Sequence, residues 1–90
     1  MRSILAVPNP STGQVLIFYR VPIASAVTLE IFGPSGVVVR RIAEGSQVAG
    51  VHAMRWDGHN DAGQQLLAGV YFTRIETPAG VTTGKVVLAR

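Results

Sequence analysis

The stretch AVTLEIFGPSGVVVRRIA, residues Ala26–Ala43, contains the pattern that decides the fold. Its first part places an apolar side chain at every second position from Val27 to Ile31. A period of two residues is typical of a β-strand with one buried face. GPSG, Gly33–Gly36, combines Gly and Pro as tight turns do, and β-branched residues are frequent again in Val37–Ala43. The stretch is therefore predicted to form a β-hairpin.

The rest of the chain repeats this alternation of short strand-like runs and turns. A rigid loop is expected over Pro8–Gly13, because each proline fixes its own φ and restricts the residue before it. No segment shows a helical period of 3.6 residues with capping residues at its ends. An eleven-residue connection is expected at Gly58–Ala68. The further strands are predicted at Gln14–Val21, Val51–Asp57, Gly69–Thr77 and Val81–Ala89, with a loop at Glu44–Gly50 and a turn at Pro78–Gly80.

Six or seven short strands separated by Gly- and Pro-containing turns predict an all-β fold. The expected architecture is an Ig-like antiparallel β-sandwich of about seven strands, formed by residues 1–90 as a single domain.

Composition limits the classes of function. Hydrophobic residues make up 48% of the 90 residues, which argues against disorder, and the absence of cysteine excludes disulfides and thiol nucleophiles. The net charge is only +3 although the pI is near 10.2, and the eight basic residues are scattered. A nucleic-acid binder would gather them on one element beside aromatic side chains. Nucleic acid is therefore not an expected partner.

Neither a membrane span nor a signal peptide is evident. A span needs ~20 consecutive apolar residues, and the opening MRSILAV is shorter in apolar residues than the ~7–15 of a secretory signal core. No membrane insertion is expected, and any export signal should lie upstream of Met1.

WDGHNDAG, residues Trp56–Gly63, gathers the kinds of side chain that metal sites use. Its spacing does not match the calcium pattern D-x-[DN]-x-[DN]-G, so adventitious Ca²⁺ binding stays only an alternative and no metal or cofactor is expected. Asp and Asn side chains commonly bond to nearby backbone groups in turns, where Gly adopts positive φ. We therefore predict a structural turn with Trp56 in the core rather than exposed for sugar stacking; its residues are Trp56, Asp57, Gly58, Asp61 and Gly63.

Catalytic chemistry is not expected. No serine lies in a G-x-S-x-G context, and the five acidic residues are mostly isolated on separate predicted strands or loops, which does not suit paired-carboxylate catalysis. The prediction is that the chain is not an enzyme.

Five motifs in order carry a family resemblance: PNPSTG, VTLEIFGPSG, AGVHAMRWDG, DAGQQLLAGVYF and the closing GKVVLAR. The chain resembles the Ig-like domain of flagellar hook-capping proteins, and still more the C-terminal sorting domains of the bacterial type IX secretion system. The second resemblance implies a non-catalytic module at the C-terminus of a larger secreted protein. Such a module directs its cargo to the surface of a Gram-negative bacterium through the periplasm. The implied partners are the upstream cargo domain and the outer-membrane sorting machinery.

The same resemblance implies that the last strand is the recognition element, with Lys85, Val87 and Arg90 as its residues. A terminal strand at a sheet edge offers unpaired backbone groups for strand addition, while Val86 and Leu88 would anchor its other side. The alternative functions are an accessory carbohydrate-binding or spacer module of an extracellular enzyme, and a hook-capping assembly domain.

Overall fold

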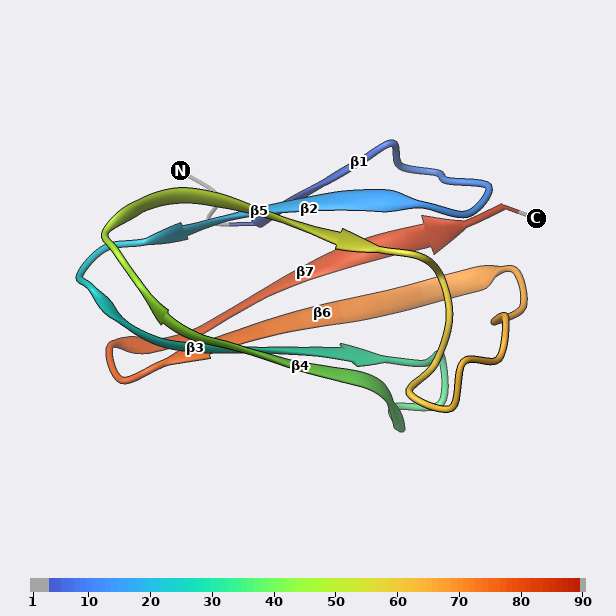
Figure 1. Cartoon of the computed structure of the whole chain (residues 1–90). Helices are drawn as coiled ribbons and strands as arrows, with labels where there is room; N and C mark the ends of the chain where they lie inside the picture. Colours follow the sequence, from blue (N-terminus) through green and yellow to red (C-terminus); the bar gives the residue numbers. More distant parts are fainter. Residues whose placement is uncertain (1–3, 90) are drawn as a thin grey trace.

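A computed structural model describes residues 4–89, which form two antiparallel β-sheets packed face to face (Figure 1). One sheet has three strands in the order β1-β2-β5, and the other has four in the order β4-β3-β6-β7. The all-β, Ig-like sandwich of about seven strands is confirmed. The strands are β1 (Ile4–Val7), β2 (Val15–Val21), β3 (Ser25–Phe32), β4 (Val38–Gln47), β5 (Gly50–Trp56), β6 (Gly69–Thr77) and β7 (Gly80–Leu88).

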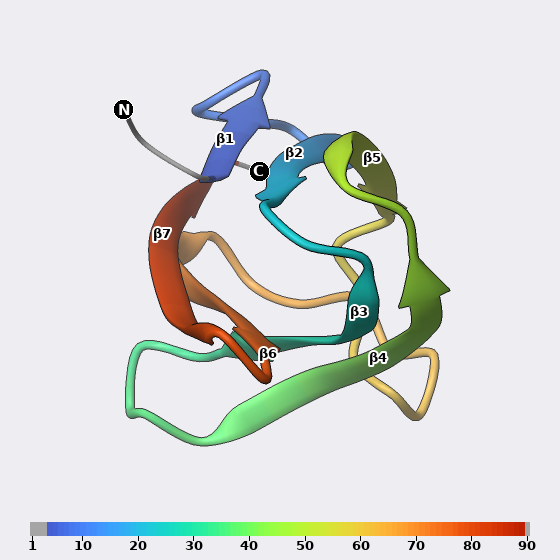
Figure 2. The same cartoon turned by 90° about the vertical axis from the view of Figure 1, so that its left-hand side faces the viewer.

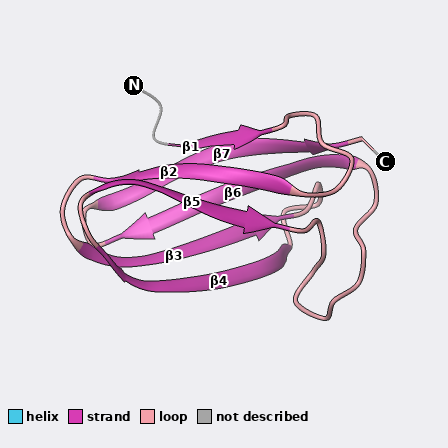
Figure 3. Cartoon of the chain, turned by 45° about the horizontal axis from the view of Figure 1, so that its top comes forward, coloured by secondary structure: helices cyan, strands magenta, loops and turns pink. Residues whose placement is uncertain are grey.

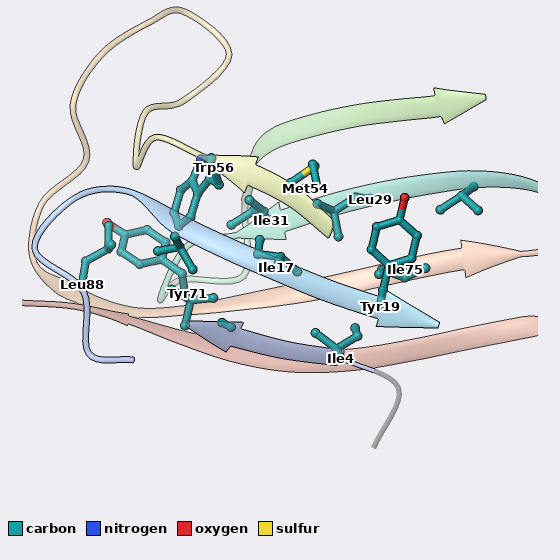
Figure 4. Close-up of a cluster of buried hydrophobic side chains, with 14 of the residues drawn as sticks. Ile4, Ile17, Tyr19, Leu29, Ile31, Met54, Trp56, Tyr71, Ile75 and Leu88 are labelled. Atoms are coloured by element: carbon teal, nitrogen blue, oxygen red, sulfur yellow. The ribbon is translucent and has the colours of Figure 1, made fainter. Parts of the chain in front are cut away.

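The core lies between the two sheets and is supplied by every second residue of each strand. In β3, Val27, Leu29 and Ile31 are at most 1% exposed, as their period of two predicts. Figure 4 shows these inward side chains meeting those of β2 and β5. The full core consists of Ile4, Ala6, Val15, Ile17, Tyr19, Val21, Val27, Leu29, Ile31, Met54, Trp56, Tyr71, Ile75, Val86 and Leu88.

An aromatic pair joins the sheets at one end of this core. The rings of Trp56 in β5 and Tyr71 in β6 lie 5.8 Å apart at 66°, close to an edge-to-face contact. Both polar atoms have backbone acceptors, since Trp56 Nε1 donates to the His59 carbonyl (3.0 Å) and the Tyr71 hydroxyl to the Leu67 carbonyl (2.7 Å). The pair therefore fixes both ends of the β5–β6 connection.

At one side of the sandwich β1 runs beside β7 (Figure 2). Gly84 of β7 makes this approach possible: a Cβ there would lie 2.9 Å from Cγ2 of Ile4 and 2.9 Å from Oγ1 of Thr73. The missing side chain lets Ile4 reach the core, where it is 7% exposed.

Most predicted strand limits are within one residue of those observed, but two segments differ by more than that. Ile4–Val7, expected only as a leading segment, forms β1 by pairing with Leu16–Tyr19. The expected loop at Glu44–Gly50 belongs mostly to β4, which keeps pairing with β3 through a bulge near Gly45. Gly45 has a φ of +69°, which glycine adopts without steric cost, so the strand absorbs one extra residue and continues.

Gly84→Ala is expected to destabilise the domain by about 1–3 kcal/mol, because the new methyl group overpacks the contact between Ile4 and Thr73. Urea denaturation measures the change. Gly13→Ala is the matched control, since a Cβ there meets nothing within 4 Å, and it should shift stability by no more than ~0.5 kcal/mol. Equal stability of the two variants would contradict the close approach.

Candidate interaction surfaces

The β5–β6 connection is a tight corner held by its own side chains. Asn60 is its hub: its Oδ1 accepts from the backbone N–H groups of Ala62 (3.0 Å) and Gln64 (2.9 Å). The Asn60 side-chain amide donates in turn to Gln64 Oε1 (3.0 Å). Gly58 and Gly63 have φ of +77° and +81°, the left-handed conformation that glycine favours. The segment therefore has the geometry of a structural turn.

Asp57 closes the start of this corner. Its Oδ1 accepts from the His59 backbone N–H at 3.0 Å, and His59 Nδ1 lies 3.4 Å from the same oxygen. Burial, the largest single influence, would raise the pKa of Asp57, but hydrogen bonding from His59 and the charges of His59 and Arg40 together hold it below its usual value. The carboxylate thus stays charged and engaged with the backbone.

Asp61 connects the corner to the edge of the other sheet, and Figure 3 shows the connection reaching from β5 toward the start of β4. Its backbone N–H donates to the Val39 carbonyl (2.9 Å), and its carboxylate accepts from the Arg41 backbone N–H (3.2 Å). Arg40 Nε lies 3.7 Å from the same carboxylate. Asp61 therefore pairs with edge groups of β4 that have no neighbouring strand.

These contacts occupy the acidic oxygens that a metal would need. Within residues 4–89, no three His, Cys, Asp or Glu side chains lie close enough together to hold a metal ion. Trp56 is 1% exposed, so its ring offers no face to a sugar.

The terminal strand β7 lies at the edge of its sheet, but its backbone there is not open as expected. Asn9 Nδ2 donates to the Lys85 carbonyl (3.1 Å), and the Val87 N–H donates to Asn9 Oδ1 (2.9 Å). Ser11 continues the pairing, because its N–H donates to the Val87 carbonyl (2.8 Å) and its carbonyl accepts from Ala89 (2.7 Å). The Pro8–Gly13 loop thus takes the place of an added strand, which corrects the expectation of unpaired edge groups.

The side chains of Lys85 and Val87 point away from the core, while Val86 and Leu88 are buried. Lys85 is in register with Phe72, and Val87 with Val70. The third residue assigned to this recognition strand, Arg90, lies outside the described residues.

The outer face of the four-stranded sheet carries a row of alternating charges. Glu30 accepts from Arg41 at 2.8 Å and from Arg74 at 3.1 Å, and Arg74 also reaches Glu76 at 3.3 Å. The Glu30 side chain is 13% exposed. The hydrogen bond from Arg41, and then the bond and charge of Arg74, lower the pKa of Glu30 despite some burial.

Apolar side chains lie in the open on the outer face of the three-stranded sheet, as Val70, Phe72 and Val81 do on the other outer face. Leu5 is 60% exposed and Val51 is 66% exposed. Strand registry brings these positions together with the outward residues of β2. The sequence contains a signal for this surface that its strand assignment did not use: in VLIFYRV, Val15–Val21, apolar residues fill successive positions instead of alternating.

A pocket of about 140 Å³ lies at one end of the sandwich. Neither a carboxylate nor a histidine is among its lining residues, which are Ile4, Tyr19, Arg20, Pro22, Ile75, Thr77, Ala79, Gly80, Val81 and Thr82. Tyr19 is the one lining side chain of a type that serves as a general acid or base, and burial, followed by the charge of Glu44, raises its pKa. In the part of the chain described, no helix is long and apolar enough to cross a membrane.

Gly63→Val is expected to cost about 1–2 kcal/mol of unfolding free energy, the cost of a left-handed conformation for a residue with a Cβ. No atom lies within 4 Å of a Cβ at this position, so the loss comes from the strained backbone and not from a clash of the Cβ. Gly63→Asn should recover part of the stability, since Asn tolerates the same φ. A Val variant that melts like the wild type would refute the strain.

Acid should destabilise the domain through Glu30. Its folded pKa lies below the ordinary value of 4.5, so its stabilisation is present above that pH and is lost as pH falls through the folded value. Between pH 7 and 2, the unfolding free energy of Glu30→Gln should decline less steeply than that of the wild type. Glu44→Gln is the control and should keep the wild-type slope; identical slopes for all three proteins would contradict the ion-pair row.

Comparison with known proteins agrees with this architecture. A family model described as the FlgD Ig-like domain matches residues 12–80. The crystal structure of FlgD from P. aeruginosa is 26% identical, with a TM-score of 0.69 over 83% of this chain and 60% of that chain. The structure of FlgD from Xanthomonas campestris, described for its insights into hook capping in flagellar assembly, is 24% identical, with a TM-score of 0.67 over 94% and 61%. That second likeness shows the fold alone. No curated protein is matched.

The chain spans about 60% of the length of these two FlgD chains. Of the two resemblances carried by the sequence motifs, these findings support the hook-capping one and give no support to a type IX sorting domain. Because the matched residues 12–80 are most of its length, the chain belongs to the FlgD Ig-like domain family.

Proposed function

We propose that this domain is a non-catalytic assembly module of a flagellar hook-capping scaffold, which binds other protein subunits at the hook. The match of the FlgD Ig-like model to residues 12–80 carries the proposal. The Pseudomonas FlgD structure supports it at 26% identity. Hook capping is a property of the whole scaffold, of which this chain corresponds to about 60%.

The geometry of the domain is consistent with assembly rather than chemistry. No carboxylate or histidine lines its pocket. In the polar cluster around Asn60, the side-chain oxygen of Asn60 accepts hydrogen bonds from the backbone of the turn. The partners of such a module are proteins, and its place is outside the cell at the growing hook rather than on a surface-attached cargo. Residues 1–90 act in this proposal as one Ig-like unit.

Two observations make the other functions less suitable. A sorting signal read by strand addition needs an open edge, whereas Asn9 and Ser11 already pair with the terminal half of β7. A carbohydrate module needs an exposed aromatic platform, whereas Trp56 is 1% exposed. The backbone groups of Lys85 and Val87 are hydrogen-bonded to Asn9 and Ser11, so these two residues can offer a partner only their side chains.

Binding of the purified domain to isolated hooks tests the proposal. The fluorescently labelled domain is mixed with hooks purified from the bacterium that encodes it, and electron microscopy with gold-labelled antibody locates it. The expected result is label at one end of each hook, because a cap occupies the growing tip. The unfolded domain, reduced to peptides by protease, is the negative control. Label absent from hooks, or spread along their sides, would overturn the hook-capping function.

A further inference from the structure

The Pro8–Gly13 loop, which passes beside the end of β7 (Figure 1), pairs with that strand at two successive positions. Ser11 pairs with its backbone N–H and C=O groups. Asn9 pairs with its side chain, since Nδ2 donates to the Lys85 carbonyl (3.1 Å) and Oδ1 accepts from the Val87 N–H (2.9 Å). A strand beside β7 would offer its own N–H and C=O to the same atoms. The carboxamide of Asn9 therefore takes the place of a peptide group.

β7 has few of the other features by which proteins block an exposed edge strand. Such features are proline, β-bulges, charged side chains and very short strands. β7 has nine residues, contains no proline and pairs with β6 without a register shift. Lys85 is its only charged residue. The other edge strand of this sheet, β4, has register shifts and carries Arg40, Arg41 and Glu44. Closure of the β7 edge therefore depends on the loop.

Asn9 makes half of the hydrogen bonds that hold the loop on the end of β7. Its side chain makes two of the four, and the Ser11 backbone makes the other two. Without the Asn9 amide, the Lys85 carbonyl and the Val87 N–H have no partner, although both point away from β6. Unpaired backbone groups at a sheet edge are a template for pairing with another chain. The Asn9 side chain thus controls whether this template is open.

The edge opened in this way is complementary to itself. In an antiparallel pair, two residues directly opposite each other exchange both N–H···O bonds, so two copies related by a two-fold axis can join through Val87 of each. Lys85 is two residues from Val87, which places the two lysines of such a pair four residues, or about 13 Å, apart. The Debye length is ~8 Å at physiological ionic strength, so their repulsion is largely screened.

We propose that Asn9 is a cap that keeps a second copy of this chain from pairing with β7. With the Asn9 amide in place the edge is closed and the domain is a monomer. Removal of the amide opens an antiparallel β7–β7 contact centred on Val87. The cap acts on the domain itself and does not depend on the hook-capping function proposed above.

Two substitutions of Asn9 and a matched control test the cap. Asn9→Ala removes both of its bonds to β7, whereas Asn9→Asp keeps an acceptor for the Val87 N–H and loses only the donor to the Lys85 carbonyl. Asn60→Ala is the control, because Asn60 is also a loop asparagine but bonds within its own turn. Thermal unfolding of each variant verifies that it is folded.

A fourth variant locates the contact. Val87→Pro, added to Asn9→Ala, removes the N–H group at the centre of the β7–β7 contact. This N–H points away from β6, and proline is tolerated in an edge strand where the N–H side faces solvent. The added proline should therefore abolish the contact and leave the sheet paired.

Sedimentation velocity over a concentration series measures self-association, and amide hydrogen exchange of Val87 reports whether β7 takes part. The wild type and Asn60→Ala should be monomers. Asn9→Ala should dimerise with a dissociation constant at least about tenfold below that of any wild-type association, and Asn9→Asp should lie between them. In Asn9→Ala the Val87 N–H should exchange fast at low concentration and become protected as the dimer forms. Addition of Val87→Pro should return the protein to the monomer.

Each other outcome overturns a distinct statement. A folded Asn9→Ala that stays monomeric overturns the cap. If Asn9→Ala associates while its Val87 N–H still exchanges fast, or if the added Val87→Pro changes nothing, the contact lies elsewhere and the assignment to β7 fails. If Asn9→Ala does not fold, Asn9→Asp decides in its place, and association no stronger than that of the wild type overturns the cap. The hook-capping function stands in all of these cases.

Discussion

The edge strands β4 and β7 of the four-stranded sheet present backbone N–H and C=O groups that no further strand pairs. Hydrogen bonds to these groups determine the course of the Pro8–Gly13 loop and of the β5–β6 connection. On β7 the partners are Asn9 and Ser11, and on β4 the partner is Asp61. Ser11 is 2% exposed as a result, although it belongs to a surface loop. The same pairing occupies the end of β7 and the start of β4, where another chain could otherwise add a strand.

Strands whose apolar residues alternate along the sequence could be predicted from that pattern alone. The period of two in Val27–Ile31 predicted which side chains of β3 enter the core, and they are at most 1% exposed. The end of β4 was not predictable in this way, because pairing beyond Glu44 depends on a bulge at Gly45 and on a partner strand about 20 residues earlier. β1 has only four residues and forms because β2 pairs with it, so its own sequence carries little signal.

In the candidate sites too, contacts between neighbours in the sequence could be predicted, whereas contacts between distant residues could not. The hydrogen bond from the His59 N–H to Asp57 joins neighbours in the sequence, and such bonds can be expected from residue type. The pairing of Asp61 with Arg41 spans 20 residues, and that of Asn9 with Val87 spans 78. Nothing in the sequence between them fixes such contacts. The apolar outer face had a local signal in Val15–Val21, but only the sandwich topology shows which of its two sides remains uncovered.

Charge distribution connects these surfaces to the excess of basic residues. Arg40, Arg41 and Arg74 are engaged by carboxylates within the domain. Among the described residues, Arg55 and Lys85 have no carboxylate within ion-pair distance, and they point from opposite outer faces. Within residues 4–89, the high pI therefore does not correspond to basic side chains gathered on one face. Arg55 is opposite Leu16 and Lys85 is opposite Phe72. A cation beside apolar side chains suits a protein surface with a matching carboxylate, where charge sets orientation and apolar burial supplies the affinity.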